Sequence, residues 1–231
     1  MKYAVFSDVH SNVFALKAAL CEIDKLRPDK IICLGDIVGN GFYPEETVSL
    51  IRERGDVICV KGNHDMFVTM DLRKFSKEDS RVKVFMWQQK ALSSASKNFL
   101  SSLPQTLKFK DGAFDITAFH YPTNRGGRFK NMKYLPTRDD LNYLFGEEKG
   151  DVFLFGHEHT GSLDVMNGRY YLNFGTLGNF LQKDTARFGM LEIDGEKIAY
   201  KPINAYYDDS TARKTTERLN EILKGNNKNE Y

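Results

Sequence analysis

The chain has 231 residues, of which 28% are charged, and its formal net charge at pH 7 is +2. The length suits one large hydrophobic core, and the near balance of charge excludes a general attraction to nucleic acid or to anionic membranes. Because no apolar run reaches the roughly 20 residues of a membrane span and the N-terminus lacks a signal-peptide core, we expect a single cytoplasmic domain over residues 1–231, with no membrane partner.

The first 63 residues alternate short apolar runs with helical patterns. The three apolar runs have the length of buried strands. Ser11 or Asn12 is placed to cap the first helix, and Pro44 suits the first position of the second, which ends at Gly55. This order predicts parallel strands in a layered α/β architecture.

Beyond residue 63 the pattern changes twice. A polar, helical stretch at about 66–103 is predicted to be an insert over the sheet edge, and its aromatic residues, including Phe67 and Phe85, are interpreted as core. Residues 162–202, with turns at Asn167-Gly168 and Asp194-Gly195, are predicted to form a second, antiparallel sheet. Further predicted elements are strands at 106–109, 113–119 and 152–155, a helix that Thr137 caps and that ends at Gly146, a C-terminal helix at about 211–224 and a frayed tail at 226–231.

The cysteines give no sign of disulfides or of a Cys-x-x-Cys metal site. Cys21, Cys33 and Cys59 are odd in number and lie in apolar helix or strand patterns. We therefore predict three buried thiols, which fits a reducing cytoplasm.

Polar side chains that can bind a metal follow the predicted strands. Ligands of open α/β sheets bind beyond the carboxyl ends of parallel strands, so we expect these side chains to converge, with Asp36 at the centre. All five histidines of the chain are among them. The residues are Asp8, His10, Asp36, Asn63, His64, Asp65, His120, His157 and His159.

Oxygen and nitrogen donors without thiolate suit manganese, iron, nickel, cobalt or zinc better than calcium. Seven candidate donors, drawn from Asp8, Asp36, Asn63 and the imidazoles, exceed the needs of one tetrahedral ion. They suffice for two ions if one carboxylate bridges them. Asp36 is the expected bridge. Such a centre acidifies a shared water and suits hydrolysis at phosphorus.

Five motifs in this order resemble the calcineurin-like metallophosphoesterase superfamily, over residues 2 to about 180. The chain length and the residues after Asp36 are most similar to its small bacterial and archaeal phosphodiesterase branch. The motifs are Asp8-x-His10, Gly35-Asp36, Gly62-Asn63-His64-Asp65, His120 and Gly156-His157-Glu158-His159.

The resemblance implies a four-layer α/β sandwich, with two mixed β-sheets packed face to face and flanked by helices. It also implies two divalent ions, with manganese the first expectation, and hydrolysis of phosphodiesters by a water that the ions share. His64 would face the phosphate, and Asp65 would orient His64. The implied ligands are Asp8, His10, Asp36 and His159 for one ion, and Asp36, Asn63, His120 and His157 for the other.

Departures from the family pattern concern the substrate more than the metal. Ser11 replaces a common glycine, Glu158 stands between the two histidines, and Tyr121-Pro122 follows His120. Asn173–Thr176 is interpreted as a supporting turn behind the site. None of these changes removes an implied ligand.

Several functions remain open at this point. The substrate is a phosphoester, with nucleotide-derived molecules among the candidates. A basic loop with Arg125, Arg128 and Lys130 either holds a substrate phosphate or is solvated. Alternatives are a phosphomonoesterase, a protein phosphatase, a dinucleotide polyphosphate hydrolase, or a non-catalytic interaction module such as the retromer subunit that resembles these enzymes.

Overall fold

The alternation of side chains along strand β1 (Lys2–Phe6) sets the layers of the protein. Tyr3 and Val5 point to one side of the strand, and Ala4 and Phe6 point to the other. All four side chains are at most 1% exposed. A strand that is buried on both faces needs a cover on each side, and here one cover is a second sheet and the other is a layer of helices.

The computed structural model describes residues 1–76, 79–133, 135–178, 184–208 and 210–225. The first sheet has the order β10-β9-β1-β2-β3, in which β1, β2 and β3 are parallel and the outer two strands are antiparallel. The further strands of this sheet are β2 (Lys30–Cys33), β3 (Val57–Cys59), β9 (Thr185–Asp194) and β10 (Lys197–Tyr206).

The second sheet has the order β4-β5-β6-β8-β7, with β5, β6 and β8 parallel. Its inner face packs on the first sheet through Leu154, Leu172 and Phe174, none of which is measurably exposed. The expected four-layer α/β sandwich of two mixed sheets is confirmed. The strands are β4 (Thr106–Asp111), β5 (Phe114–Phe119), β6 (Val152–Phe155), β7 (Ser162–Met166) and β8 (Arg169–Asn173).

The prediction that residues 162–202 form a sheet of their own is wrong. The two expected hairpins are present, but β8 pairs with β6 in the second sheet, whereas β9 pairs with β1 in the first. Hairpin turns fix only the pairing of adjacent strands. The apolar faces of β8 and β9 then decide which sheet each hairpin joins, and that choice depends on distant residues.

Helices α1 (Val13–Leu26) and α2 (Pro44–Arg54) cover the outer face of the first sheet. The side chain of Asn12 accepts a hydrogen bond from the amide of Ala15 and so caps α1, while Gly55 ends α2 in the left-handed conformation. The prediction of a buried Cys21 is wrong, because this thiol lies beside the buried stripe of α1 and is exposed. Cys33 and Cys59 are buried as predicted.

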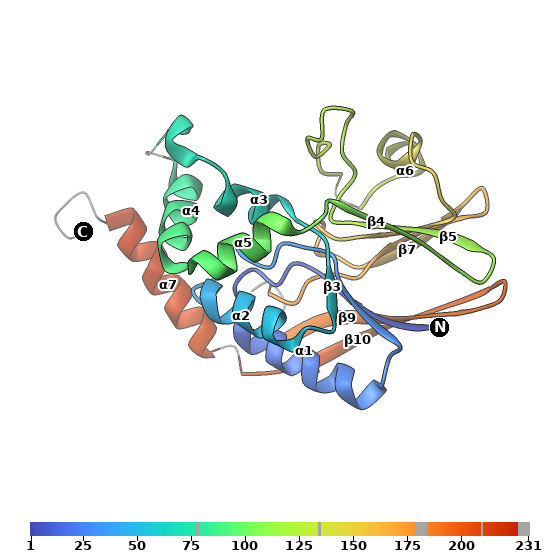
Figure 1. Cartoon of the computed structure of the whole chain (residues 1–231), viewed down its shortest axis with the longest axis horizontal. Coiled ribbons are helices and arrows are strands. Elements are labelled where there is room, and N and C mark those ends of the chain that lie inside the picture. The colour runs from blue at the N-terminus through green and yellow to red at the C-terminus, as the bar shows by residue number, and fades with distance from the viewer. Residues whose placement is uncertain (77–78, 134, 179–183, 209, 226–231) are drawn as a thin grey trace.

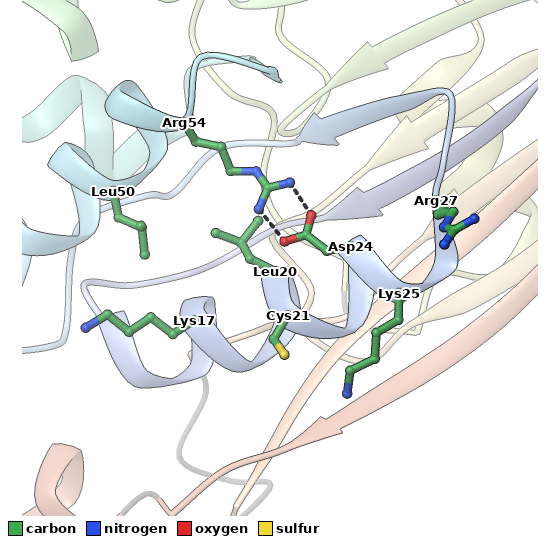
Figure 2. A pocket seen from close by; sticks show the side chains of 8 residues that line it. All are labelled: Lys17, Leu20, Cys21, Asp24, Lys25, Arg27, Leu50 and Arg54. Atoms are coloured by element: carbon green, nitrogen blue, oxygen red, sulfur yellow. Dashed lines mark hydrogen bonds and ion pairs between the residues drawn. The ribbon is translucent and has the colours of Figure 1, made fainter.

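The two helices are also joined by an ion pair at the rim of a groove of about 740 Å³ (Figure 2). The guanidinium group of Arg54 in α2 binds both carboxylate oxygens of Asp24 in α1, and its Nε donates to Asp56 at 2.8 Å. The cationic head of Arg54 is therefore already occupied by carboxylates. None of the five histidines lines this groove.

Between β3 and β4 the described residues form three α-helices and one 3₁₀ turn, on the stretch where the insert at about 66–103 is expected. They lie beyond one edge of the first sheet, with α7 against α4 (Figure 1). Helix α6 covers the outer face of the second sheet, and Thr137 caps it as predicted. The bounds are α3 (Asn63–Thr69), η1 (Leu72–Lys74), α4 (Ser80–Ala91), α5 (Ser94–Ser102), α6 (Arg138–Phe145) and α7 (Ser210–Gly225).

Among the described residues, no helix has the length and apolar character that crossing a bilayer requires. The predicted tail at 226–231 lies outside the described residues.

Candidate metal centre

The predicted donors come together where the strands of both sheets end. Asp8 follows β1, Asp36 follows β2 and Asn63 begins α3 just beyond β3. From the second sheet, His120 follows β5 and His157 follows β6. The parallel strands of each sheet point their carboxyl ends at the same place, so residues distant in sequence become neighbours there.

Five of the seven predicted ligands adopt a left-handed backbone conformation. Their φ angles lie between 51° and 73°, a region that non-glycine residues enter rarely. Each such residue costs on the order of 1–3 kcal/mol unless the surroundings hold it, and such residues gather at functional sites. The five are Asp8, His10, Asp36, His157 and His159.

Asp8 links the two sheets. Its Oδ2 atom accepts a hydrogen bond of 2.9 Å from the amide of His157, and its own amide donates to the carbonyl of Gly35 at 3.0 Å. Its carbonyl oxygen accepts from the hydroxyl of Thr176 at 2.8 Å. One aspartate thus connects the loops after β1, β2, β6 and β8, so that a shift of one sheet would displace the donors of the other.

One group of donors consists of Asp8, His10 and His159. The Nε2 atom of His159 lies 3.1 Å from Oδ1 of Asp8, and that of His10 lies 3.6 Å from the same oxygen. The two imidazole Nε2 atoms are 3.0 Å apart. Three donors that face one another so closely, all of them largely buried, are an arrangement that a cation stabilises.

A second group consists of Asp36, His120 and His157. The Nε2 atom of His120 lies 3.3 Å from Oδ2 of Asp36 and 3.2 Å from Nδ1 of His157. The Oδ1 atom of Asn63 is buried and has no hydrogen-bond partner among the described residues. The amide of the next residue, His64, binds Asp36, and an orphaned buried oxygen at this position in the chain fits a further ligand, because an unpaired buried acceptor is otherwise unfavourable.

A backbone carbonyl group fixes the orientation of the His120 ring. Its Nδ1 atom lies 2.8 Å from the carbonyl oxygen of Leu34, to which an Nδ1–H group donates. The remaining ring nitrogen, Nε2, points to Asp36 and His157 and is the atom that would bind a metal ion. Metal-binding histidines are commonly held in this way by a carbonyl or carboxylate on the other ring nitrogen.

Burial and charge set the protonation of the group. Burial would raise the pKa of Asp36, but the nearby imidazoles, His120 foremost, hold that pKa well below its usual range. Burial would lower the pKa of His120, yet the carboxylates of Asp36 and Asp8 raise it to about 9. Burial, together with the charge on a neighbouring imidazole, lowers the pKa of His10 to about 3 and that of His157 to about 4. Neutral imidazoles are the form that binds metals, so His10 and His157 are in that form near neutral pH, whereas His120 would give up a proton when an ion binds.

His64 lies closer to the donors than the sequence suggested. Its amide donates to Oδ1 of Asp36 at 2.8 Å, and its Nε2 atom is 3.8 Å from Oδ2 of the same residue. Its ring packs edge-on against His10, with centroids 4.9 Å apart. The side chain is 20% exposed, whereas His10 is 2% exposed, so His64 stands at the accessible rim of the cluster.

The predicted contact between Asp65 and the His64 ring is wrong. The Asp65 carboxylate accepts from the amide of Val38 at 3.1 Å and from that of Gly62 at 2.9 Å. The Nδ1 atom of His64 has no hydrogen-bond partner in the part of the chain that the structure describes. Asp65 thus caps α3 and ties it to the loop after Asp36, because a carboxylate in the first turn of a helix binds the free amides there.

Two glycines make room for the cluster. A Cβ atom on Gly62 would lie 2.1 Å from Oδ1 of Asp36, and one on Gly39 would lie 2.0 Å from Nδ1 of His64. Gly39 also has a φ of +104°, which suits glycine. The glycines of the sequence motifs are thus required by close approach to the reactive side chains.

Gln88 of α4 is a supporting residue that the sequence reasoning missed. It is fully buried, its Oε1 accepts from the amide of Gly39 at 3.0 Å, and its Nε2 donates to the carbonyl of Gly41 at 3.1 Å. The signal was available, since Gln88 continues the buried stripe of Val82 and Phe85 at helical spacing. A polar residue in such a stripe indicates a buried hydrogen-bonded role.

The predicted supporting turn after β8 lies behind the site. The Nδ2 atom of Asn173 donates to the carbonyl of Gly156 at 2.9 Å, and its Oδ1 accepts from the amide of Gly175. These bonds, with that of Thr176 to Asp8, hold the loop that carries His157 and His159.

Two of the three basic side chains in the loop after His120 bind partners outside the donor cluster. The ammonium group of Lys130 donates to the carbonyls of Tyr143 and Leu144 at the end of α6. Arg125 is exposed and lies 3.5 Å from Glu147. These partners belong to the outer helix layer and not to the donor cluster.

The clustering of these donors agrees with what a comparison with known proteins shows. A family model described as the calcineurin-like phosphoesterase superfamily domain matches residues 1–196. This chain belongs to the calcineurin-like phosphoesterase superfamily. Membership identifies it as a metallophosphoesterase, a metal-dependent hydrolase of phosphoesters.

One known protein sequence and two solved structures are similar to this chain. The chain is 34% identical over 183 residues to the uncharacterized protein MJ0912 of Methanocaldococcus jannaschii, covering 74% of this chain and 70% of that protein. It resembles the structure of a metallophosphoesterase from Sphaerobacter thermophilus, at 26% identity and a TM-score of 0.71, over 96% of this chain and 97% of the other. The hypothetical protein PH1004 of Pyrococcus horikoshii shares the fold, with a TM-score of 0.81, 20% identity and the same two coverages.

We predict that Gly39→Ala displaces the His64 imidazole, because the new Cβ would overlap its Nδ1 atom. In NMR spectra of the five histidines, the ring signals of His64 should shift. Gly55→Ala is the matched control, since Gly55 also has a positive φ, of +72°, but a Cβ atom there would have nothing within 4 Å. Both variants should lose some stability from the strained backbone. Unchanged His64 signals in Gly39→Ala would refute the close approach.

Proposed function

We propose that this metallophosphoesterase is a two-metal phosphodiesterase in which Asp36 bridges the ions. The observation that carries the proposal is that Asp36 belongs to two clusters of possible ligand atoms that lie within 4.8 Å of one another, one with His10 and His64 and the other with His120 and His157. One ion would be held by Asp8, His10, Asp36 and His159, and the other by Asp36, Asn63, His120 and His157. Residues 1–231 are taken as one domain, in which the stretch at about 66–103 is an insert and that at about 211–224 a terminal helix.

The donor set supports two transition-metal ions, manganese first, with iron, nickel, cobalt and zinc as alternatives. When bound, a pair of such ions acidifies a shared water and neutralises charge on the phosphoryl oxygens. The role of the protein is to keep the donors in place and largely shielded from water. The left-handed residues and the buried hydrogen bonds of Asp8 and Asp65 support that role.

His64 is proposed to act on the substrate directly. It stands at the rim of the cluster with a partly exposed ring, and its backbone is held by Asp36. From there its imidazole would donate a proton or a hydrogen bond to the leaving oxygen, as a positioned histidine does near neutral pH. Asp65 would position the helix that carries His64, through the amides of Gly62 and Val38.

The charges around the cluster favour a diester over a monoester. The ion pairs of Asp8 and Asp36 are with histidines, and none is with a lysine or arginine of the described residues. Lys61, next to the Gly62-Asn63 motif, donates instead to the carbonyl of Ser101 at 2.7 Å. A monoester dianion carries one more negative charge than a diester and would gain more from such cations.

We expect purified protein loaded with manganese to hold two ions per chain, and Asp36→Ala to hold none, because Asp36 is the proposed ligand of both ions. Elemental analysis after removal of free metal measures the ratio. Asp24→Ala, a carboxylate removed from the α1–α2 groove, serves as control and should keep two ions. A wild type with one ion or fewer, or an Asp36→Ala protein with two, would disprove the bridge.

The function is tested by comparing matched substrates. We expect kcat/KM to be higher for an aryl phosphodiester than for the aryl monoester with the same leaving group, since among the described residues no lysine or arginine pairs with Asp8 or Asp36 and could bind a second negative charge. The metal-free protein should hydrolyse neither. If the metal-loaded enzyme clearly prefers the monoester, the phosphodiesterase assignment is wrong and a phosphomonoesterase takes its place.

His64→Ala should lower kcat by about 10²–10⁴-fold while both metals stay bound, which is the usual range for general acid catalysis. The loss should shrink for a good leaving group such as nitrophenolate, because that oxygen needs little protonation. Elemental analysis confirms metal content in each preparation. Equal losses for good and poor leaving groups would show that His64 stabilises the transferring phosphoryl group instead of acting as an acid.

A further inference from the structure

A pocket of about 530 Å³ adjoins the metal centre between α3 and α4. Asn63 and His64 form part of its wall, and Asn40 from the loop after Asp36 lies at the same side. The pocket is therefore continuous with the site to which the phosphoester must bind. Its size is within the range of cavities that hold small molecules.

The far wall of the pocket is aromatic. The rings of Phe67 and Phe85 are stacked, with centroids 5.2 Å apart and planes inclined by 16°. Phe75 packs edge-on against Phe67 at 6.0 Å, and the ring of His64 packs edge-on against Phe85 at 5.1 Å. His64 thus connects the donor cluster to a row of three phenylalanines.

Packing of the protein interior accounts for only part of this wall, because Phe85 and Phe67 pack in the core whereas other apolar residues of the wall do not. Phe85 is 8% exposed and belongs to the core, as the sequence predicted, but Phe75 is 38% exposed. Val84, one position from Phe85, also lines the pocket outside the buried stripe of α4. Apolar side chains that stay open to water beside a polar site indicate a binding surface for an apolar group.

The charges of the pocket select for a neutral group. Its described lining contains one arginine, Arg81, and no lysine. The guanidinium group of Arg81 lies 2.9 Å from the carboxylate of Asp79, which lines the same pocket. The two charges offset each other, so the pocket offers little to a second phosphate and suits an uncharged ring.

From this wall and this charge we infer that the pocket between α3 and α4 binds a flat aromatic group of the substrate, such as an aryl ring or a nucleobase. The inference rests on the proposed function and specifies its substrate class: phosphoesters in which an aromatic group lies close to the phosphorus. Stacking on the phenylalanine wall would hold that group while the phosphate lies at the metal centre.

Binding of two phosphonates to the manganese-loaded protein tests the inference without turnover. Phenylphosphonate and methylphosphonate carry the same anionic head and differ in the ring. We expect calorimetry to show that the wild type binds phenylphosphonate about tenfold more tightly, the scale of one ring stacked on an aromatic wall. Equal affinities would overturn the pocket assignment and leave the proposed function standing.

Two pocket variants and one control variant test whether the preference for phenylphosphonate arises in this pocket. Val84→Trp fills the pocket and should abolish the preference for phenylphosphonate, with methylphosphonate binding unchanged. Val165→Trp makes the same change on β7, where Val165 is 52% exposed, and should keep the preference. Phe75→Ala removes a ring that is 38% exposed and should weaken phenylphosphonate binding by several-fold even if Val84→Trp folds poorly.

The outcomes separate the two proposals. A preference that survives both Val84→Trp and Phe75→Ala places the ring elsewhere and overturns the inference. If neither phosphonate binds to the metal-loaded wild type, the pocket assignment fails, whereas the proposed function fails only if the same preparation does not hydrolyse the aryl phosphodiester.

Discussion

The structure depends on a buried carboxylate that must be kept charged. Asp36 is 1% exposed, and burial of an ionised carboxylate is unfavourable unless hydrogen bonds and opposite charges compensate. The compensation comes from the amide of His64 and from the imidazole of His120, which arrive from the two different sheets. The carbonyl of Asp36 also accepts from the amide of His10. The packing of the two sheets and the placement of the donors therefore depend on each other, and Asp36 lies where the two sheets meet.

The local features of the fold were accessible from the sequence. The strand at Val152–Phe155 has the predicted bounds, because a short apolar run between polar residues has few alternatives. Asn12, one of the two predicted caps of α1, and Thr137, the predicted cap of α6, cap their helices, since capping depends on residues three positions apart. The convergence of donors also followed from a general rule on strand ends, which needs the order of the strands and no knowledge of their neighbours.

The predictions that failed concern features that depend on contacts between distant residues. The hairpins at 162–202 were recognised, but β8 and β9 join different sheets because their partners are β6 and β1. Asp65 was expected at the His64 ring, whereas the free amides of Gly62 and Val38 compete for its carboxylate and hold it. The pocket beside His64 could not be foreseen either, because it depends on how α4 lies against α3 and not on a pattern within either helix.

The central claim is that Asp36 holds two ions together at the junction of the sheets. Crystals of the manganese-loaded protein, measured with X-rays above and below the manganese absorption edge, test it most directly. The account predicts two anomalous peaks about 3.5–4 Å apart, the usual spacing of two-metal sites, with an Asp36 carboxylate oxygen within bonding distance of both. A single peak, or two peaks of which one lies out of reach of Asp36, would contradict it.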